Sequence, residues 1–291
     1  MNMARGSYCS NAKSGSLFMR ILASLIAASG LYLIASPSVV LAGEGTVAAD
    51  VAKCAGISTS TASLGEKGQK VKVYAFIIKK PGLTDEQFHA HWRDPHGTLT
   101  ATLPYFKRYV QNHGIGSLPT LPGLTPMPYL GIPTVWVDQL SDLEAAVADP
   151  LYAPLDRDVD ELYIRDKAAW LFTTEYSRCV SPTNKAFAPI KAQVFIKQKP
   201  GTSDFEGHMA EFSKALGSLP GVIGLTAALP LQGSDAPLFD GVVEVSFEDQ
   251  DHFEAAWTDD GPDGALAMLD TFADRDGSRG FLSREERVIW P

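Results

Sequence analysis

Two stretches of the chain share one pattern of apolar and polar residues, VKVYAFIIKKPG at 71–82 and IKAQVFIKQKPG at 190–201. Each is an apolar run that ends on Lys-Pro-Gly, which is typical of a buried strand followed by a turn. Further landmarks recur in the same order, at offsets of 119, 116 and 110 residues. We interpret the chain as two homologous modules. The paired landmarks are Lys80-Pro81-Gly82 with Lys199-Pro200-Gly201, Leu103-Pro104 with Leu219-Pro220, and Leu143–Ala146 with Phe253–Ala256.

The periodicities predict the element order β-α-β-β-α-β in each module. Thr84 opens a helix with Gln87 in the capping-box position, and Pro95 breaks that helix so that Asp94 caps a second piece. This order predicts an α+β fold of two ferredoxin-like modules, packed sheet to sheet as an intramolecular barrel. The predicted elements are 71–79 (strand), from 84 and from 95 (helices), 105–113 and 133–137 (strands), from 141 and around 156–163 (helices), 168–177 (strand), 191–199 (strand), 203–217 (helix), 221–228 and 239–247 (strands), 250–274 (helix) and 280–290 (strand).

The N-terminal segment has the pattern of a secretory signal peptide. A basic Arg20 precedes an apolar core at 21–35, and a small-residue cleavage site ends at Ala42. A membrane anchor is the alternative, but Gly, Ser and Pro interrupt the apolar run. We expect export to the periplasm or beyond, with either Met1 or Met19 as the start. The predicted organisation is 1–42 signal peptide, 43–69 flexible lead, 70–178 module one, 179–189 linker and 190–291 module two.

Charge and cysteine content narrow the possible partners. The net charge is −9, and removal of three basic residues with the signal peptide gives −9 − 3 = −12. Such an acidic protein is not expected to bind nucleic acid or to stay on an anionic membrane. Cleavage leaves Cys54 and Cys179, for which we predict a disulfide that closes a loop of 179 − 54 = 125 residues. The chain-entropy model values that loop at about 5 kcal/mol; two separate buried thiols are the alternative.

One segment carries a family resemblance. FIIKKPGLTDEQFHAHWRDPHGTLTATLPYFKRYVQNH (76–113) resembles the opening half of an EthD domain, within the dimeric α+β barrel superfamily. The pattern joins Lys-Pro-Gly, His-Trp on a helix, His-Gly, Leu-Pro and a strand ending in Asn-His. The resemblance implies a protein without metal or organic cofactor. It also implies either a role in ether degradation, under a loose oxidoreductase label, or a lyase-like activity on aromatic compounds.

Module two keeps the architecture but has lost the histidines of this pattern. In the Lys-Pro-Gly register, His91 corresponds to Ala210 and His96 to Ala215. One working cleft, in module one, is therefore the natural inference.

Four of the six histidines lie within 25 residues of one another in this segment. We predict His96 as the acid/base residue, because it follows a helix break and its neutral form is favoured at a helix N-terminus. Gly97 beside it should leave room for substrate. Tyr109 and His113, on the next strand, are predicted as catalytic neighbours. His91, Trp92 and Gln111 are predicted to bind the substrate.

The remaining residues of the segment have simpler expected roles. His89 lies off the apolar face and should be in solvent, and 156–161 (DRDVDE) should be a solvated helical face. The loop 114–130 is predicted either to roof the cleft or to cover a sheet edge.

Several alternatives remain open. Metal binding is disfavoured, because His89 and His91 are two apart on a helix and diverge by about 200°; haem is a weaker possibility, and packing is the simplest account of His91. Two functions remain. One is a cofactor-free acid/base enzyme, of the lyase or isomerase type, acting on a small hydrophobic or aromatic molecule. The other is a non-catalytic carrier or accessory protein. Either would be a monomer or homodimer.

Overall fold

The structure is a computed structural model that describes residues 71–116, 119–179, 189–231, 236–258 and 261–290. The predicted signal peptide, the lead and Cys54 lie outside the described residues, so export and the disulfide stay predictions. In the described ranges, no helix has the length and apolar character needed to cross a membrane.

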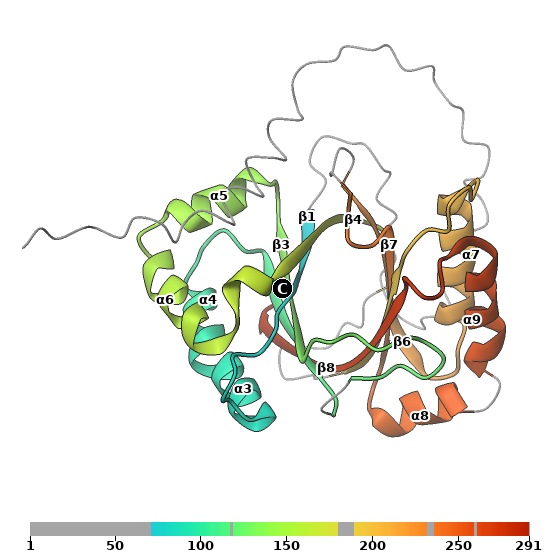
Figure 1. Ribbon diagram of the computed structural model, residues 1–291, viewed down its shortest axis with the longest axis horizontal. Helices are drawn as coiled ribbons and strands as arrows, with labels where there is room; N and C mark the ends of the chain where they lie inside the picture. The colour runs from blue at the N-terminus through green and yellow to red at the C-terminus, as the bar shows by residue number, and fades with distance from the viewer. Residues whose placement is uncertain (1–70, 117–118, 180–188, 232–235, 259–260, 291) are drawn as a thin grey trace, which may run out of the picture. The chain divides into compact units, whose positions relative to one another are not determined.

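Eight antiparallel strands form one closed barrel in the order β1-β3-β2-β8-β5-β7-β6-β4 (Figure 1). Each strand is an apolar segment bounded by turn residues, as the sequence pattern predicts. The strands are β1 (Val71–Phe76), β2 (Arg108–Gly114), β3 (Gly131–Val137), β4 (Ala169–Cys179), β5 (Ile190–Ile196), β6 (Val222–Pro230), β7 (Gly241–Phe247) and β8 (Arg279–Ile289).

The two halves of the barrel repeat one strand order. The first half runs β4-β1-β3-β2 and the second runs β8-β5-β7-β6. Their edges are joined by hydrogen bonds between β2 and β8 and between β4 and β6. The halves therefore share one continuous closed barrel, as the predicted intramolecular barrel requires, and they join through the edges of their sheets.

Helices follow the first and third strands of each half. The predicted helix 250–274 is two helices in the structure, and the other predicted helices lie where the pattern places them. They are α3 (Asp85–His91), the π-helical turn η1 (Trp92–His96), α4 (Gly97–Ala101), α5 (Ser141–Ala148), α6 (Tyr152–Leu162), the 3-10 turn η2 (Arg165–Lys167), α7 (Phe205–Gly217), α8 (Gln250–Thr258) and α9 (Gly261–Phe272).

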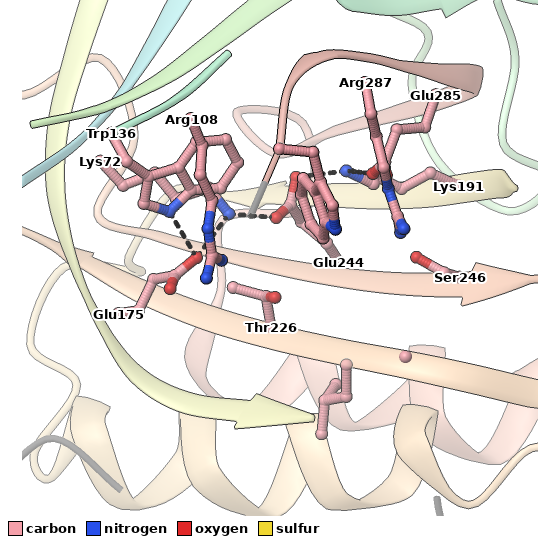
Figure 2. Close-up of a pocket in the computed structure, with 13 residues that line it drawn as sticks. Lys72, Arg108, Trp136, Glu175, Lys191, Thr226, Glu244, Ser246, Glu285 and Arg287 are labelled. Atoms are coloured by element: carbon pink, nitrogen blue, oxygen red, sulfur yellow. Dashed lines mark hydrogen bonds and ion pairs between the residues drawn. The ribbon is translucent and has the colours of Figure 1, made fainter. Parts of the chain in front are cut away.

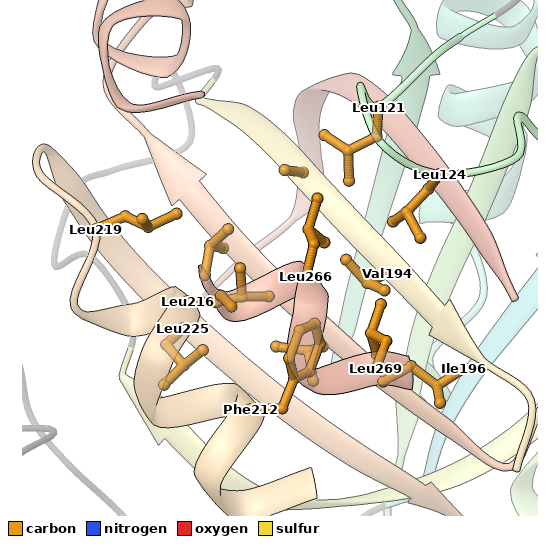
Figure 3. Close-up of a cluster of buried hydrophobic side chains, with 14 of the residues drawn as sticks. Leu121, Leu124, Val194, Ile196, Phe212, Leu216, Leu219, Leu225, Leu266 and Leu269 are labelled. Atoms are coloured by element: carbon orange, nitrogen blue, oxygen red, sulfur yellow. The ribbon is translucent and has the colours of Figure 1, made fainter. Parts of the chain in front are cut away.

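The loop between β2 and β3 reaches the second half of the chain, so neither predicted role describes it fully. Leu121 and Leu124 pack into the cluster that α7 and α9 form against the sheet (Figure 3). The indole N–H of Trp257 donates to the carbonyl oxygen of Pro122 at 3.2 Å. Met127 joins an apolar cluster with Phe76 and other barrel side chains. The loop therefore fastens the halves together by burying apolar area.

Strand β2 presents different side chains on its two faces, because successive residues of a strand point to opposite sides. Asn112 donates to Thr134 at 3.0 Å on one face. Tyr109 and Gln111 contact Trp92, from the helical segment, on the other. Two separate groups of polar residues therefore lie on the two sides of this strand.

Candidate functional site

Helix α3 begins as its sequence predicts. The hydroxyl of Thr84 accepts from the backbone N–H of Gln87 at 3.1 Å, and the side chain of Gln87 accepts from the backbone N–H of Thr84 at 2.8 Å. This capping box satisfies two backbone donors that have no partner within the helix. It fixes the start of the segment that carries the histidines.

The helical path is interrupted at Asp94, as Pro95 predicts. Asp94 has φ −153° and ψ 122°, and its carboxylate accepts from the hydroxyl of Thr98 at 2.9 Å. The chain passes through η1 and resumes as α4. This break lets His91 and His96, five positions apart, turn toward the same neighbour.

That neighbour is Asp158 on α6. Its Oδ1 lies 2.7 Å from Nε2 of His91, and its Oδ2 lies 2.8 Å from Nδ1 of His96. An ionised carboxylate only accepts, so each ring must donate an N–H to it. The side chains of His96 and Asp158 are 10% and 11% exposed. One carboxylate therefore sets the tautomer and orientation of two imidazole rings. In the neutral ring of His96, the proton is on Nδ1 and Nε2 is the unprotonated nitrogen.

Electrostatics favour the ionised form of Asp158. Burial alone would raise the pKa of this carboxyl group, but hydrogen bonds from His96 and His91 outweigh burial and lower it. The expectation of a purely solvated face at 156–161 is therefore wrong at Asp158. The sequence already places Asp158 on the buried side of α6. The buried residues of this helix are Leu155, Val159 and Leu162, and Asp158 lies three residues after the first and four before the last.

Trp92 is the centre of a second group of residues. Its indole N–H donates to the hydroxyl of Tyr109 at 3.1 Å, and its carbonyl oxygen accepts from the side-chain amide of Gln111 at 2.6 Å. The same amide donates to Tyr109 at 3.1 Å. Trp92 and Gln111 are fully buried. Burial raises the pKa of Tyr109 to about 12, against hydrogen bonds that lower it, so this phenol stays protonated near neutral pH.

His113 extends this group towards α3. Its Nε2 lies 3.0 Å from Oε1 of Gln111, an acceptor, so Nε2 carries the proton. Its Nδ1 lies 2.9 Å from Nδ1 of His89 and must accept. The expectation of His89 in solvent is wrong, because α3 lays its ring against His113 with centroids 5.1 Å apart. Burial lowers the pKa of His113 to about 2, and repulsion from His89 and Arg93 adds to this.

Two glycines give Trp92 and Gln111 their space. A Cβ on Gly97 would lie 2.9 Å from the amide nitrogen of Gln111, and a Cβ on Gly131 would lie 2.3 Å from the ring of Trp92. Gly97 was expected to leave room for a substrate. The structure corrects this, because the Gln111 side chain occupies that room.

The predicted site residues therefore fall into two clusters. His91 and His96 meet on Asp158, while Tyr109, Gln111 and His113 contact Trp92 or one another. Tyr109 and His113 were predicted as catalytic neighbours of His96. Their hydrogen bonds go to Trp92, Gln111 and His89. Strand β2 turns their side chains toward Trp92 instead.

The second half of the chain lacks the His91–Asp158–His96 group. Each half has an isolated β-bridge at the equivalent place, Lys79 with Tyr163 in the first half and Gln198 with Ala273 in the second. These bridges align helix α6 of the first half with helix α9 of the second, at an offset of 273 − 163 = 110 residues. Asp158 then corresponds to Met268, as His91 and His96 correspond to Ala210 and Ala215. Helix α7 runs unbroken where the first half has the break at Asp94. The repeated architecture is therefore built without these three residues.

The buried His113 predicts acid sensitivity. Below pH 6.5 the unfolded chain binds a proton at His113 that the folded protein excludes until about pH 2, so the free energy of unfolding should fall as pH falls through this window. The loss is about 1.4 kcal/mol per pH unit. His113→Gln keeps an N–H donor toward Gln111 and removes the titration.

Denaturant unfolding at about pH 6, 5 and 4 measures this slope. The free energy of unfolding should fall less steeply with pH in His113→Gln, by about 1.4 kcal/mol per pH unit. The matched control is His252→Gln, at an exposed histidine outside this cluster, and it should not reduce the slope. An unchanged slope in His113→Gln would mean that His113 takes up its proton in the folded protein.

Comparisons with known proteins agree with this architecture. The family model of the EthD domain matches residues 80–165. A crystal structure of an anthrone oxidase-like protein superimposes with a TM-score of 0.52 at 10% identity, over 79% of this chain and 97% of the other. A proposed monooxygenase from Fusobacterium nucleatum subsp. nucleatum ATCC 25586 gives 0.50 at 7% identity, over 75% and 92%. No curated protein matches.

A solved EthD family protein from Bacillus halodurans C-125 is also similar, at 16% identity and a TM-score of 0.29 over 35% of this chain and 95% of that one. The segment 80–165, which contains all the predicted catalytic and substrate-binding residues, is an EthD domain. The chain as a whole has a mixed α/β fold with one closed eight-stranded barrel, similar to that of the anthrone oxidase-like protein.

Proposed function

We propose that this protein is a cofactor-independent acid/base enzyme that moves a proton on a small hydrophobic or aromatic molecule. The observation that carries the proposal is the sharing of Asp158 by His91 and His96, at 2.7 and 2.8 Å, in the half of the chain that retains the EthD pattern. A histidine held through Nδ1 by a carboxylate keeps Nε2 available as a base. His96 is that base, and Asp158 is its positioning residue.

The surroundings support an apolar substrate. Phe88, Trp92 and Leu162 belong to one buried cluster, with Tyr163 and Trp170 packed against it, and they come from the same elements, α3, η1 and α6, that carry the two histidines and Asp158. A neutral imidazole next to such side chains suits removal of a proton from carbon beside a carbonyl group. Return of the proton to another atom of the same molecule is an isomerisation. If instead a leaving group departs as the carbanion electrons form a double bond, and takes up the proton, the reaction is that of a lyase.

Deuterium exchange tests the proposal without knowledge of the natural substrate. Anthrone is a suitable probe, because its methylene group is acidic and a protein of the same fold is anthrone oxidase-like. In D₂O the folded protein should incorporate deuterium at that carbon faster than buffer or heat-denatured protein. Equal rates for a panel of aromatic carbon acids would contradict the proposal, and a Soret band in the purified protein would favour haem.

A carrier function is the second candidate. It is favoured because Trp92, Tyr109, Gln111 and His113, four of the predicted site residues, bond to one another in an arrangement that serves packing rather than proton transfer. A carrier would hold its ligand without turnover. Small molecules identified by mass spectrometry in the purified protein, combined with no exchange activity, would support it.

The architecture of the two halves belongs to the same proposal. Each half orders its strands as fourth, first, third, second, which is the order of a ferredoxin-like module. The second module then supplies the barrel edge that a partner subunit would otherwise provide. Export and the bridge between Cys54 and Cys179 remain predictions that intact-mass and thiol measurements can check.

A further inference from the structure

The helix break that carries His96 is attached to strand β2 through the side chain of Gln111. In a continuous α-helix, the carbonyl oxygen of Trp92 would accept from the backbone N–H four residues on, which is that of His96. At the break it accepts from the N–H of Gly97, five residues on. The side-chain amide of Gln111 donates to the same oxygen at 2.6 Å, so this carbonyl group uses both of its lone pairs.

Gly97 allows the amide to come this close. A Cβ on Gly97 would lie 2.9 Å from the amide nitrogen of Gln111, so a larger residue there would displace the amide from Trp92. Gln111 is fully buried, and its side-chain oxygen accepts from Nε2 of His113 at 3.0 Å. Both ends of this amide are therefore engaged in contacts within the protein.

A second contact holds the chain one turn beyond the break. The hydroxyl of Thr100, which is buried, donates to the carbonyl oxygen of His96 at 2.9 Å. Burial raises the pKa of Tyr109, and hydrogen bonds with Gln111 and Thr100 oppose this shift. The segment from Trp92 to Thr100 is therefore tied to β2 on both sides of His96.

Helix α7 in the second half runs unbroken, and different residues occupy the equivalent places there. Strand β7 matches β3 at an offset of 241 − 131 = 110 residues, so their pairings with β6 and β2 align the two halves. The Lys-Pro-Gly register aligns the helices. The amide, the phenol and the glycine therefore occur in the half that has the break. The replacements are Ala227 for Gln111, Leu225 for Tyr109 and Leu216 for Gly97.

We propose that Gln111 is a positioning residue for His96, because it fixes the helix break and thereby the place of Nε2 relative to the substrate. This inference rests on the proposed function, since it gives Gln111 a part in the same acid/base step. A displacement of about 1 Å at a reacting group can slow a reaction roughly 100-fold. The role differs from the substrate binding that the sequence predicted for Gln111, since it needs no contact with the substrate.

Gln111→Met tests the proposal, because methionine keeps the length of the side chain but donates no hydrogen bond. Two quantities are measured in the folded protein. The rate of deuterium exchange into anthrone should fall by roughly 10- to 100-fold. A long-range ¹H–¹⁵N correlation spectrum should show the proton of His96 shared between Nδ1 and Nε2, because the ring is no longer held against Asp158.

Asn112→Leu is the matched control, because Asn112 is the next residue of β2 and faces the inside of the barrel. It is fully buried, and its amide donates to the carbonyl oxygen of Ile132 at 2.7 Å. The buried ion pair of Lys72 with Glu244 lies on this inner side as well (Figure 2). Loss of the Asn112 amide should lower stability and leave the exchange rate and the tautomer of His96 unchanged.

Gly97→Ala provides a second variant if Gln111→Met does not fold. Gly97 has ordinary helical angles, φ −60° and ψ −43°, so alanine suits its backbone. The added Cβ displaces the end of the Gln111 side chain and should produce the same change at His96. Gly264→Ala on α9, where a Cβ meets nothing within 4 Å, is its control and should change neither quantity.

The two quantities separate this inference from the proposed function. If both variants keep the wild-type exchange rate and the His96 proton on Nδ1, Gln111 does not position His96, although wild-type exchange would still support the enzyme. Equal changes in Asn112→Leu would also overturn the inference, because they would reflect a general loss of stability. If the wild-type protein shows no exchange, the proposed function fails, and a tautomer change confined to Gln111→Met and Gly97→Ala still supports the positioning of the ring.

Discussion

His96→Asn is expected to slow protein-catalysed deuterium exchange by about 10²- to 10⁴-fold, the usual contribution of a general base. The Asn side-chain amide places an N–H close to the position of Nδ1, so the bond to Asp158 at 2.8 Å can persist. The variant lacks the second ring nitrogen that would take the proton. Its melting temperature should therefore stay close to that of wild type.

His91→Gln is the matched control. His91 uses Nε2 to reach Asp158, and the amide nitrogen of Gln lies near that position. This variant should keep most of the activity if His91 only helps to hold Asp158. Full activity in His96→Asn, or equal losses in both variants with a lower melting temperature, would show that the group is structural and would favour the carrier.

Glu244→Gln is expected to lower the free energy of unfolding by about 3–5 kcal/mol, because removal of one partner leaves an uncompensated buried charge. Glu244 is 3% exposed and contacts Lys72, while Gln193 donates to it at 2.6 Å. The substitution keeps the shape of the side chain, removes its charge and turns one acceptor oxygen into an N–H donor, so Lys72 loses the charge of this partner.

Glu161→Gln provides the comparison for this prediction. Glu161 pairs with Lys80 at 3.1 Å on the surface, with side chains 68% and 39% exposed. Such pairs contribute about 0–1 kcal/mol. Denaturant unfolding of both variants at neutral pH measures the difference. Similar small losses in both would mean that water screens the pair of Glu244 with Lys72 as fully as it screens the surface pair.

The order of elements was accessible from the sequence because local signals agree with one another. The repeated Lys-Pro-Gly strands, the capping box at Thr84 and the break before Pro95 each act within a few residues. The closure of the barrel depends instead on pairing between distant edges, β2 with β8 and β4 with β6. No local pattern encodes that pairing.

The site was harder to predict because its partners come from distant segments. His96 and Asp158 are 62 residues apart, and only the position of Asp158 within the apolar face of α6 hinted at the contact. Lys72 and Lys191 occupy the same place in the two repeated strands, at the offset of 119. A charged residue repeated inside an otherwise apolar strand was a signal for the buried ion pairs that these two lysines make with Glu244.

The tautomers of the histidine rings decide whether Nε2 of His96 can accept a proton, and their measurement needs no substrate. A long-range ¹H–¹⁵N correlation spectrum of the neutral rings reports which nitrogen carries the proton. Because Asp158 accepts from both rings, we expect the proton of His96 on Nδ1 and that of His91 on Nε2. Asp158→Asn should release both preferences. A proton on Nε2 of His96 in the wild-type protein would contradict the account, because that nitrogen could not act as the base.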